Sequence, residues 1–172
     1  MQTEVNQNYS NYASNAINNF FSYYKQRFGS AKPIFVCIGS PNVPWDNIGP
    51  YVGSILSDID PTLKVYGTIK KPVNSVNVNT FAKRLWVKNF FNKPIIAIDA
   101  CIGQSIPGTI WCLESSGIKP GEGCGKDLEY IGNTAILVTT TDNAETLETD
   151  NTKMMQIAIN IAKSIYENLC RL

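Results

Sequence analysis

The sequence predicts a single three-layer α/β domain, with a mostly parallel central sheet and helices on both of its faces. Residues 33–39 are a continuous apolar run, and residues 94–100 repeat this pattern with an acid near the end, which is typical of strands buried on both faces of a parallel sheet. Segments with a helical spacing of apolar residues alternate with these strands, and this alternation indicates right-handed βαβ units. The chain of 172 residues suits one domain, so residues 1–172 are treated as a single unit.

The chain starts with a polar stretch that is followed by an amphipathic helix. Residues 1–8 are polar and are expected to form a disordered tail. Over residues 9–28 the apolar positions recur at steps of three and four, which predicts a helix that Gly29 ends. The aromatic side chains of this segment are expected to pack in the core or to form a dimer face, rather than to stack on the bases of a nucleic acid. A homo-oligomer is therefore one of the two alternatives. The aromatic side chains are those of Phe20, Phe21, Tyr23 and Tyr24.

The strand predicted at residues 33–39 leads into a strand–loop–helix unit. Residues 40–46 contain two prolines and form a loop. Apolar spacing then predicts a helix over residues 48–59, with Asp46 or Asn47 near its start. A short second strand follows at residues 63–67. In the commonest open sheet of this class the first and third strands are neighbours, and ligands bind beyond their carboxyl ends.

The rest of the chain continues the alternation of helix and strand. We expect a loop over residues 69–76, a helix over 78–90, the strand over 94–100, a strand over 108–113, a loop over 117–127, a strand over 135–141 and a helix over 150–169. The glycine-rich loop does not match the phosphate-binding pattern G-x-x-x-x-G-K-[ST], because Pro120 and Asp127 occupy two of its required positions. Its Lys126 is a candidate to bind a carboxylate or to stabilise an oxyanion, and a solvated loop lysine is the alternative.

The residue content excludes several classes of function. The chain contains no histidine, which removes Ser-His and Cys-His nucleophiles and histidine-ligated metal sites. Five cysteines without a CxxC pair argue against a disulfide framework and a structural zinc site, and they favour the cytoplasm. We expect neither a metal nor another cofactor.

Charge and hydropathy do not predict a nucleic acid or a membrane as a partner. The net charge of +1 gives no bulk attraction to either. Lys83 and Arg84 share a predicted helix, where a solvated helix face is the simpler interpretation. No apolar stretch approaches the roughly 20 residues of a membrane span, and the N-terminus does not resemble a secretory signal. A soluble protein is expected.

Two aspartates are the best candidates for a functional site. Asp99 ends the strand at residues 94–100, and Asp46 lies in the loop after the strand at residues 33–39. If these strands are neighbours, about 4.8 Å apart, both carboxyl groups can face one cleft, where one pKa rises because they resist ionising together. One would then act as acid and the other as base toward water or a carbonyl. The simpler alternatives are a helix cap for Asp46 and a backbone hydrogen bond in a turn for Asp99.

Several segments resemble the sporulation protein family YyaC. They are the segments at residues 36–40, 45–53, 65–68, 94–103, 107–108 and 119–126. The likeness runs in order from about residue 32 to residue 169. Through this family the chain resembles the germination protease of spore-forming bacteria and, more distantly, the hydrogenase maturation proteases. The resemblance implies a phosphorylase/hydrolase-like α/β fold.

The resemblance also implies an activity. In the germination protease two aspartates are associated with peptide cleavage, and by motif these fall on Asp46 and Asp99. The hydrogenase maturation proteases bind nickel of their substrate with corresponding acids and a histidine, which this chain lacks. The implied function is an aspartate-dependent hydrolase that cleaves a protein or peptide, such as a small acid-soluble spore protein, in the mother cell or the forespore. The alternatives are a non-catalytic regulatory or binding protein and a metal-assisted hydrolase.

The neighbours of the two aspartates complete the expected site. Substrate-binding roles are assigned to Gly39, Ser40, Trp45, Asn47 and Lys126. Packing is an equal alternative for Trp45, which precedes Asp46. A further residue, Cys101, is a conceivable nucleophile, but a structural thiol is the favoured interpretation because no histidine can activate it.

Overall fold

The computed structural model describes residues 2–87, 93–103, 106, 108–121, 125, 129–140 and 151–172. The helices are α1 (Gln2–Phe28), α2 (Ile48–Ile59), α3 (Val78–Val87) and α5 (Asn151–Leu169). The strands are β1 (Ile34–Cys37), β2 (Lys64–Tyr66), β3 (Ile95–Ile102), β4 (Ile110–Leu113) and β5 (Thr134–Thr140). The described helices include none that is long and apolar enough to cross a membrane.

One five-stranded sheet organises the chain, with the strand order β2-β1-β3-β5-β4. β1 pairs in parallel with both β2 and β3, and β3 pairs in parallel with β5. Among the described strands, only β4 runs antiparallel to its neighbour, which is β5. The prediction of a mostly parallel α/β sheet with neighbouring first and third strands is therefore confirmed.

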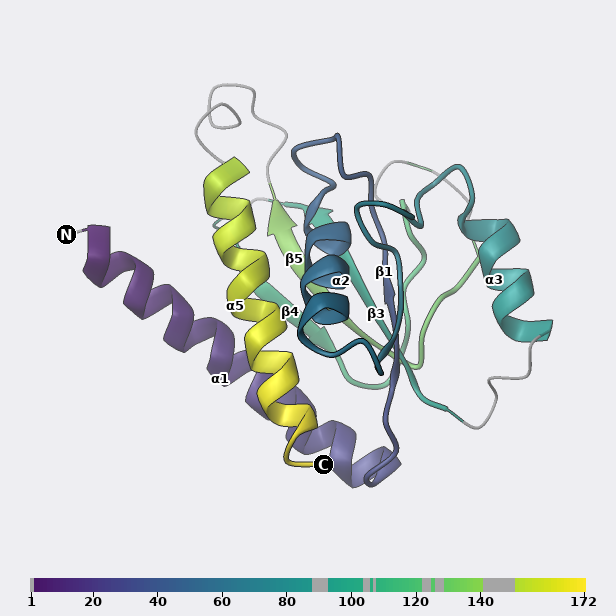
Figure 1. Cartoon of the computed structure of the whole chain (residues 1–172), viewed down its shortest axis with the longest axis horizontal. Coiled ribbons are helices and arrows are strands. Elements are labelled where there is room, and N and C mark those ends of the chain that lie inside the picture. The colour runs from purple at the N-terminus through teal and green to yellow at the C-terminus, as the bar shows by residue number, and fades with distance from the viewer. Residues whose placement is uncertain are drawn as a thin grey trace.

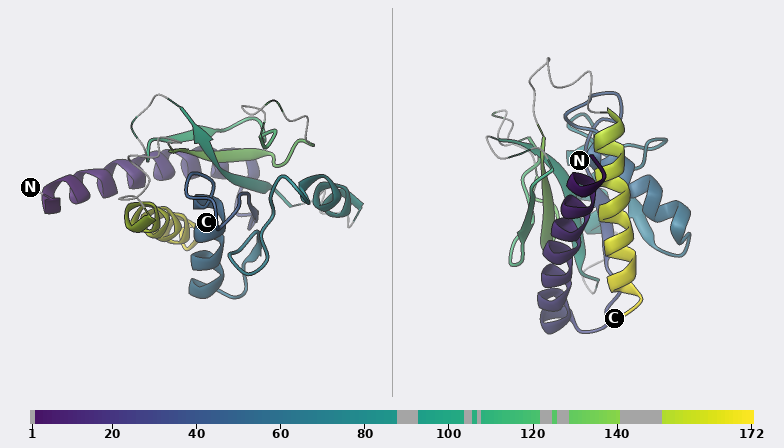
Figure 2. Two further views of the ribbon diagram at one scale, coloured as in Figure 1. Left: turned by 90° about the horizontal axis from the view of Figure 1, so that it is seen from above. Right: turned by 90° about the vertical axis from the view of Figure 1, so that its left-hand side faces the viewer.

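Helices cover both faces of the sheet, which explains why the central strands are apolar without alternation. Phe35 and Cys37 of β1 belong to a core that includes α1, α2 and α5. The alternate residues Ile34 and Val36 belong to a second core, which includes the buried face of α3. Figure 1 and the left panel of Figure 2 show α2 and α5 lying together on one side of the strands. The expected three-layer arrangement follows from these two cores.

The first helix is longer than the sequence predicted. α1 begins at Gln2, whereas residues 1–8 were expected to form a disordered tail. The apolar stripe that marks the helix starts only at Ala13, but residues 2–10 contain neither glycine nor proline, so nothing in them ends a helix. The predicted aromatic core is confirmed, because Phe20 and Tyr24 are fully buried.

Candidate functional site

A tight loop at the end of β1 places Asp46. The backbone N–H of Asp46 donates to the carbonyl oxygen of Val43 at 2.9 Å. The N–H of Ser40 donates to the carbonyl oxygen of Asp46 at 2.8 Å and to its carboxylate Oδ2 at 2.9 Å. These bonds fold the loop back on itself, so Asp46 lies beside Ser40, close to the end of β1.

Gly39 permits this close approach. It is buried and has a φ of 140°, a conformation that other residues rarely adopt. A Cβ atom added here would lie 2.1 Å from the carbonyl oxygen of Asp46. Any side chain at this position would therefore push Asp46 away from the end of β1.

Asp99 lies within β3 and not at its end, since the strand continues to Ile102. It nevertheless faces the end of β1, because Cys37 is the last β1 residue in the ladder and pairs with Ile98. The N–H of Ile38 donates to the carbonyl oxygen of Ile98 at 2.7 Å, which continues this register by one residue. The longer β3 therefore extends past β1 at the point where the sequence predicted a ligand site.

The carboxyl group of Asp99 is buried and sits close enough to Asp46 to respond to its charge. Asp99 is only 7% exposed, and its Oδ1 accepts a hydrogen bond from the N–H of Ala100 at 2.8 Å. Burial raises the pKa of Asp99 well above its ordinary value, and the negative charge of Asp46 raises it further. The Ala100 N–H opposes both effects without cancelling them. Burial and the charge of Asp46 therefore both favour the protonated form of Asp99.

The two aspartates line one cleft of about 690 Å³. Gly39 and Trp45, two of the predicted site residues, also line it. The carbonyl oxygen of Trp45 accepts a hydrogen bond from Thr140 Oγ1 at 2.8 Å, which ties the Asp46 loop to the end of β5. Residues that are 53 positions apart in the chain therefore share one cavity wall.

The other three predicted substrate-binding residues are not part of the described cleft lining. Ser40 acts through its backbone N–H and does not line the cleft. Asn47 is 1% exposed, does not line the cleft and occupies the N-cap position of α2 without a side-chain capping hydrogen bond, so Asp46 is not the N-cap residue. Lys126 lies outside the described residues.

Sequence reasoning missed the opposite wall of the cleft. This wall includes Lys119 and Tyr130, whose ring lies 6.0 Å from the Lys119 ammonium group. An isolated antiparallel bridge between Ile118 and Ile131 holds the two residues together. Lys119 falls within the segment that resembles the YyaC family, but a bridge between distant loops leaves no periodic signal in the sequence.

Cys101 also lines the cleft, and its surroundings favour the neutral thiol. Burial raises the pKa of the Cys101 thiol, and the nearby Asp99 raises it further. Thr139 Oγ1 lies 3.8 Å from its sulfur. This environment is the opposite of one that activates a cysteine nucleophile.

Among the described residues, no group of three or more cysteine, aspartate or glutamate side chains is arranged to hold a metal ion. The described lining of the cleft includes two carboxyl groups, one buried and one half-buried, and a lysine.

Comparison with known proteins places the chain in a family. The model of the family described as "Protein of unknown function (DUF1256)" matches residues 5–168, which is nearly the whole chain. The chain belongs to the DUF1256 family. The chain is also similar to the uncharacterized protein YyaC of Bacillus subtilis (strain 168), with 33% identity over 147 residues. The match covers 83% of this chain and 71% of that protein, so the predicted YyaC relationship is confirmed.

Proposed function

We propose that this DUF1256 protein is an aspartate-dependent peptidase in which Asp46 and Asp99 activate water on a peptide bond. The observation that carries the proposal is the placement of a buried Asp99 against the charge of Asp46 in one open cleft. Two carboxyl groups with separated pKa values can serve as one acid and one base at the same pH.

The environment of each aspartate supports a separate role for it in this proposal. Asp99 holds the shared proton because it is the buried member of the pair. Asp46 is half-buried, and the Ser40 N–H that donates to its Oδ2 favours its ionised form. Asp46 is therefore the base and Asp99 the acid.

The proposed reaction balances with these two groups and one water molecule. The water oxygen attacks the carbonyl carbon of the substrate while its proton passes to Asp46. The proton of Asp99 passes to the carbonyl oxygen, which gives a neutral tetrahedral intermediate. When the C–N bond breaks, Asp46 gives its proton to the leaving amine, and the hydroxyl proton returns to Asp99 as the product carboxyl group forms. The pair is then ready for another cycle.

The proposed substrate is a protein or a peptide. The cleft is open, and its volume of about 690 Å³ exceeds what a single side chain needs. Its rim carries exposed apolar groups, among them Trp45 and Tyr130, which suit side chains on both sides of a scissile bond. The resemblance to the germination protease makes small acid-soluble spore proteins the first substrates to test. It also suggests the cytoplasm of the mother cell or the forespore as the site of action.

Cleavage by matched variants tests the proposal. The purified protein is incubated with small acid-soluble spore proteins and with a peptide library, and products are identified by mass spectrometry. Asp46→Asn and Asp99→Asn should each lower the rate about 10²-fold or more, as expected for lost proton transfer. Asp58→Asn on α2 is the surface control and should keep the full rate. Full activity in both site variants would refute the mechanism.

Two rival functions give different results in the same experiment. A binding protein would retain the substrate without cleaving it, and Asp46→Asn would weaken retention. A metal-assisted hydrolase would lose activity with a chelator and would gain thermal stability when the metal is added back. The proposed peptidase should be insensitive to the chelator.

A further inference from the structure

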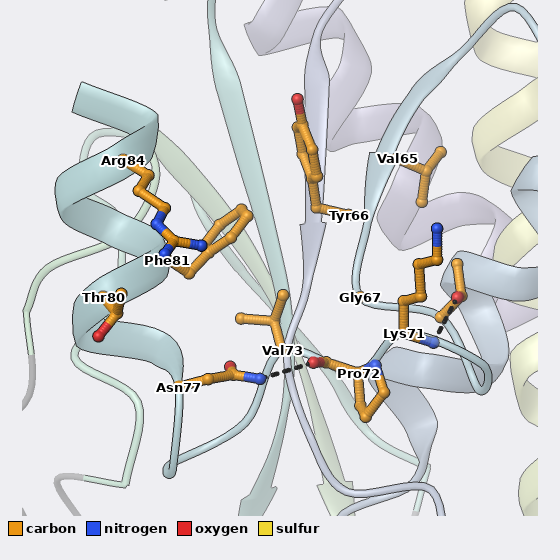
Figure 3. A pocket seen from close by; sticks show the side chains of 11 residues that line it. Val65, Tyr66, Gly67, Lys71, Pro72, Val73, Asn77, Thr80, Phe81 and Arg84 are labelled. Carbon is orange, nitrogen blue, oxygen red and sulfur yellow. Dashed lines mark hydrogen bonds between the residues drawn. The ribbon is translucent and has the colours of Figure 1, made fainter. Parts of the chain in front are cut away.

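A second pocket, of about 340 Å³, lies between β2 and α3. Figure 3 shows side chains from three segments around it: the end of β2, the turn that follows it, and the first turns of α3. Neither Asp46 nor Asp99 lines this pocket. It is therefore a site separate from the carboxylate cleft.

Two positive charges approach this pocket from different segments. Lys71 extends from the turn after β2, and Arg84 extends from α3 on the opposite side of the pocket (Figure 3). The described lining contains no aspartate or glutamate, and in the described part of the chain neither cation is paired with a carboxylate. An anionic group placed beside either cation would gain a charge-assisted hydrogen bond that the described residues do not supply.

The remaining wall is apolar and aromatic. The rings of Tyr66 and Phe81 meet edge to face, with centroids 5.2 Å apart. Both side chains are half-buried and line the pocket together with Val65 and Pro72. A cavity of about 340 Å³ with such walls accepts one aromatic or aliphatic side chain of a ligand.

The pocket is held in shape by hydrogen bonds. Asn77 Nδ2 donates to the carbonyl oxygen of Pro72 at 2.9 Å, which fixes the start of α3 to the turn. The backbone groups of Thr68 and Lys71 bond each other at 3.1 and 3.2 Å. A site formed before binding costs less ordering when the ligand arrives.

β2 also offers a backbone edge beside the pocket. It is the outermost strand of the described sheet and pairs only with β1. In a parallel pair, every second residue turns its N–H and C=O groups away from the partner strand. A peptide that lies along this edge can bond the backbone of β2 and place a side chain in the pocket.

We propose that the pocket between β2 and α3 binds an extended peptide segment that carries acidic side chains on both sides of an aromatic or aliphatic side chain. One carboxylate pairs with Lys71 and another with Arg84, and the apolar side chain packs against Tyr66 and Phe81. This inference does not depend on the peptidase proposal. The loop between β2 and α3 lies between the two sites, since its Ser75 lines the carboxylate cleft.

Binding of a defined probe tests this inference. The probe is a fluorescein-labelled hexapeptide that alternates glutamate with valine and phenylalanine, and its affinity is measured by fluorescence polarisation. The Asp99→Asn protein is the background, so that cleavage cannot consume the probe. The double variant Lys71→Ala/Arg84→Ala should bind about tenfold or more weakly, as two lost charge-assisted bonds imply. Nuclear magnetic resonance shifts should concentrate at Val65, Tyr66 and Thr80.

Matched controls separate this site from general attraction to positive charge. Lys70 and Lys83 are exposed neighbours of the two cations but do not line the pocket. The double variant Lys70→Ala/Lys83→Ala carries the same change in net charge and should keep the affinity within about twofold. A probe with glutamine in place of glutamate should bind weakly and should not distinguish the two double variants.

Several outcomes would overturn the inference. Equal weakening in both double variants would mean unspecific electrostatic attraction. Absence of binding at about 1 mM probe, where a site of millimolar affinity is half occupied, would exclude the site. If free phenylpropionate displaced the probe with an affinity equal to the probe's own, the ligand would be a small carboxylic acid and the peptide assignment would be wrong. Shifts confined to Gly39 and Ala100 would place the probe in the carboxylate cleft instead.

Discussion

The N–H of Ser40 donates to two oxygens of Asp46, the backbone carbonyl at 2.8 Å and the carboxylate Oδ2 at 2.9 Å. One backbone group thus fixes both the path of the loop and the direction of the side chain. The carboxylate of Asp46 thereby takes its place in the cleft that Asp99 also lines.

Replacing Gly39 by alanine should destabilise the protein and displace Asp46. The added methyl group would lie 2.1 Å from the carbonyl oxygen of Asp46, and the φ of 140° is unfavourable for alanine. We expect a loss of about 2–3 kcal/mol in the free energy of unfolding, measured by urea denaturation. Gly29→Ala is the control, because Gly29 also has a positive φ of 62° but has no atom within 4 Å of the added Cβ. The Gly29→Ala substitution should lower the free energy of unfolding by about 1–2 kcal/mol. Equal losses would show that the close approach to Asp46 has no energetic effect.

Replacing Thr140 by valine should loosen the Asp46 loop. Thr140 Oγ1 donates to the carbonyl oxygen of Trp45 at 2.8 Å, and valine has nearly the same shape without the donor. Thermal melting should show a loss of about 1 kcal/mol, and cleavage should slow because the loop is less ordered.

Thr134→Val is the matched control on the same strand. Thr134 is fully buried, and its Oγ1 has no hydrogen-bond partner in the described part of the chain. The same substitution should therefore be neutral or stabilising there, since it removes a buried, unpaired hydroxyl group. A destabilisation by Thr134→Val as large as that by Thr140→Val would contradict the role given to the Thr140–Trp45 bond.

The buried carboxyl group of Asp99 should make the folded protein less stable as the pH rises. Its pKa is raised in the folded protein, so the unfolded chain loses this proton first, and folding becomes less favourable above an unfolded pKa near 3.8. Asp99→Asn removes this cost, so the variant should melt at a higher temperature than the native protein at neutral pH. The advantage should disappear below about pH 3.8, where the native carboxyl group is protonated in both states.

Asp60→Asn is a comparison variant for which the melting temperature at neutral pH should change in the opposite direction. Hydrogen bonds from Thr62 lower the pKa of Asp60, so this carboxylate stabilises the fold above its unfolded pKa and loses that effect as the pH falls. Asp60→Asn should therefore melt at a lower temperature at neutral pH. If Asp99→Asn behaved in the same way, Asp99 would be ionised in the native protein, and its proposed role as acid would be wrong.

Cys101 should be dispensable for cleavage and slow to react with alkylating reagents. Its pKa is raised by burial, which keeps it in the unreactive thiol form, whereas Cys170 is exposed near the C-terminus. Mass spectrometry after iodoacetamide treatment should show Cys170 modified before Cys101. Cys101→Ala should retain the cleavage rate within about threefold, far from the 10²-fold loss expected for a proton-transfer residue. A loss as large as that of Asp99→Asn would identify Cys101 as a nucleophile.

The parts of the fold that depend on local patterns were predicted well from the sequence. The apolar runs at β1 and β3 reflect burial on both faces, and neighbouring strands at a switch point bring Asp46 and Asp99 to one edge of the sheet. The end of β3 was not predicted correctly, because β5 supports three residues beyond Asp99 through pairing that the sequence does not show. The position of Lys119 in the cleft was not predicted either. It depends on the bridge between Ile118 and Ile131, which are 13 residues apart in the chain.

The most direct test of the central claim is a carboxyl titration of Asp99 by carbon-13 nuclear magnetic resonance, in the native protein and in Asp46→Asn. If the two aspartates share a proton, Asp99 should titrate well above 3.8 in the native protein, and its pKa should fall when the charge of Asp46 is removed. The fall should be partial, because burial is the larger cause and remains in the variant. An Asp99 that titrates near 3.8, or one that does not respond to Asp46→Asn, would contradict the shared-proton mechanism.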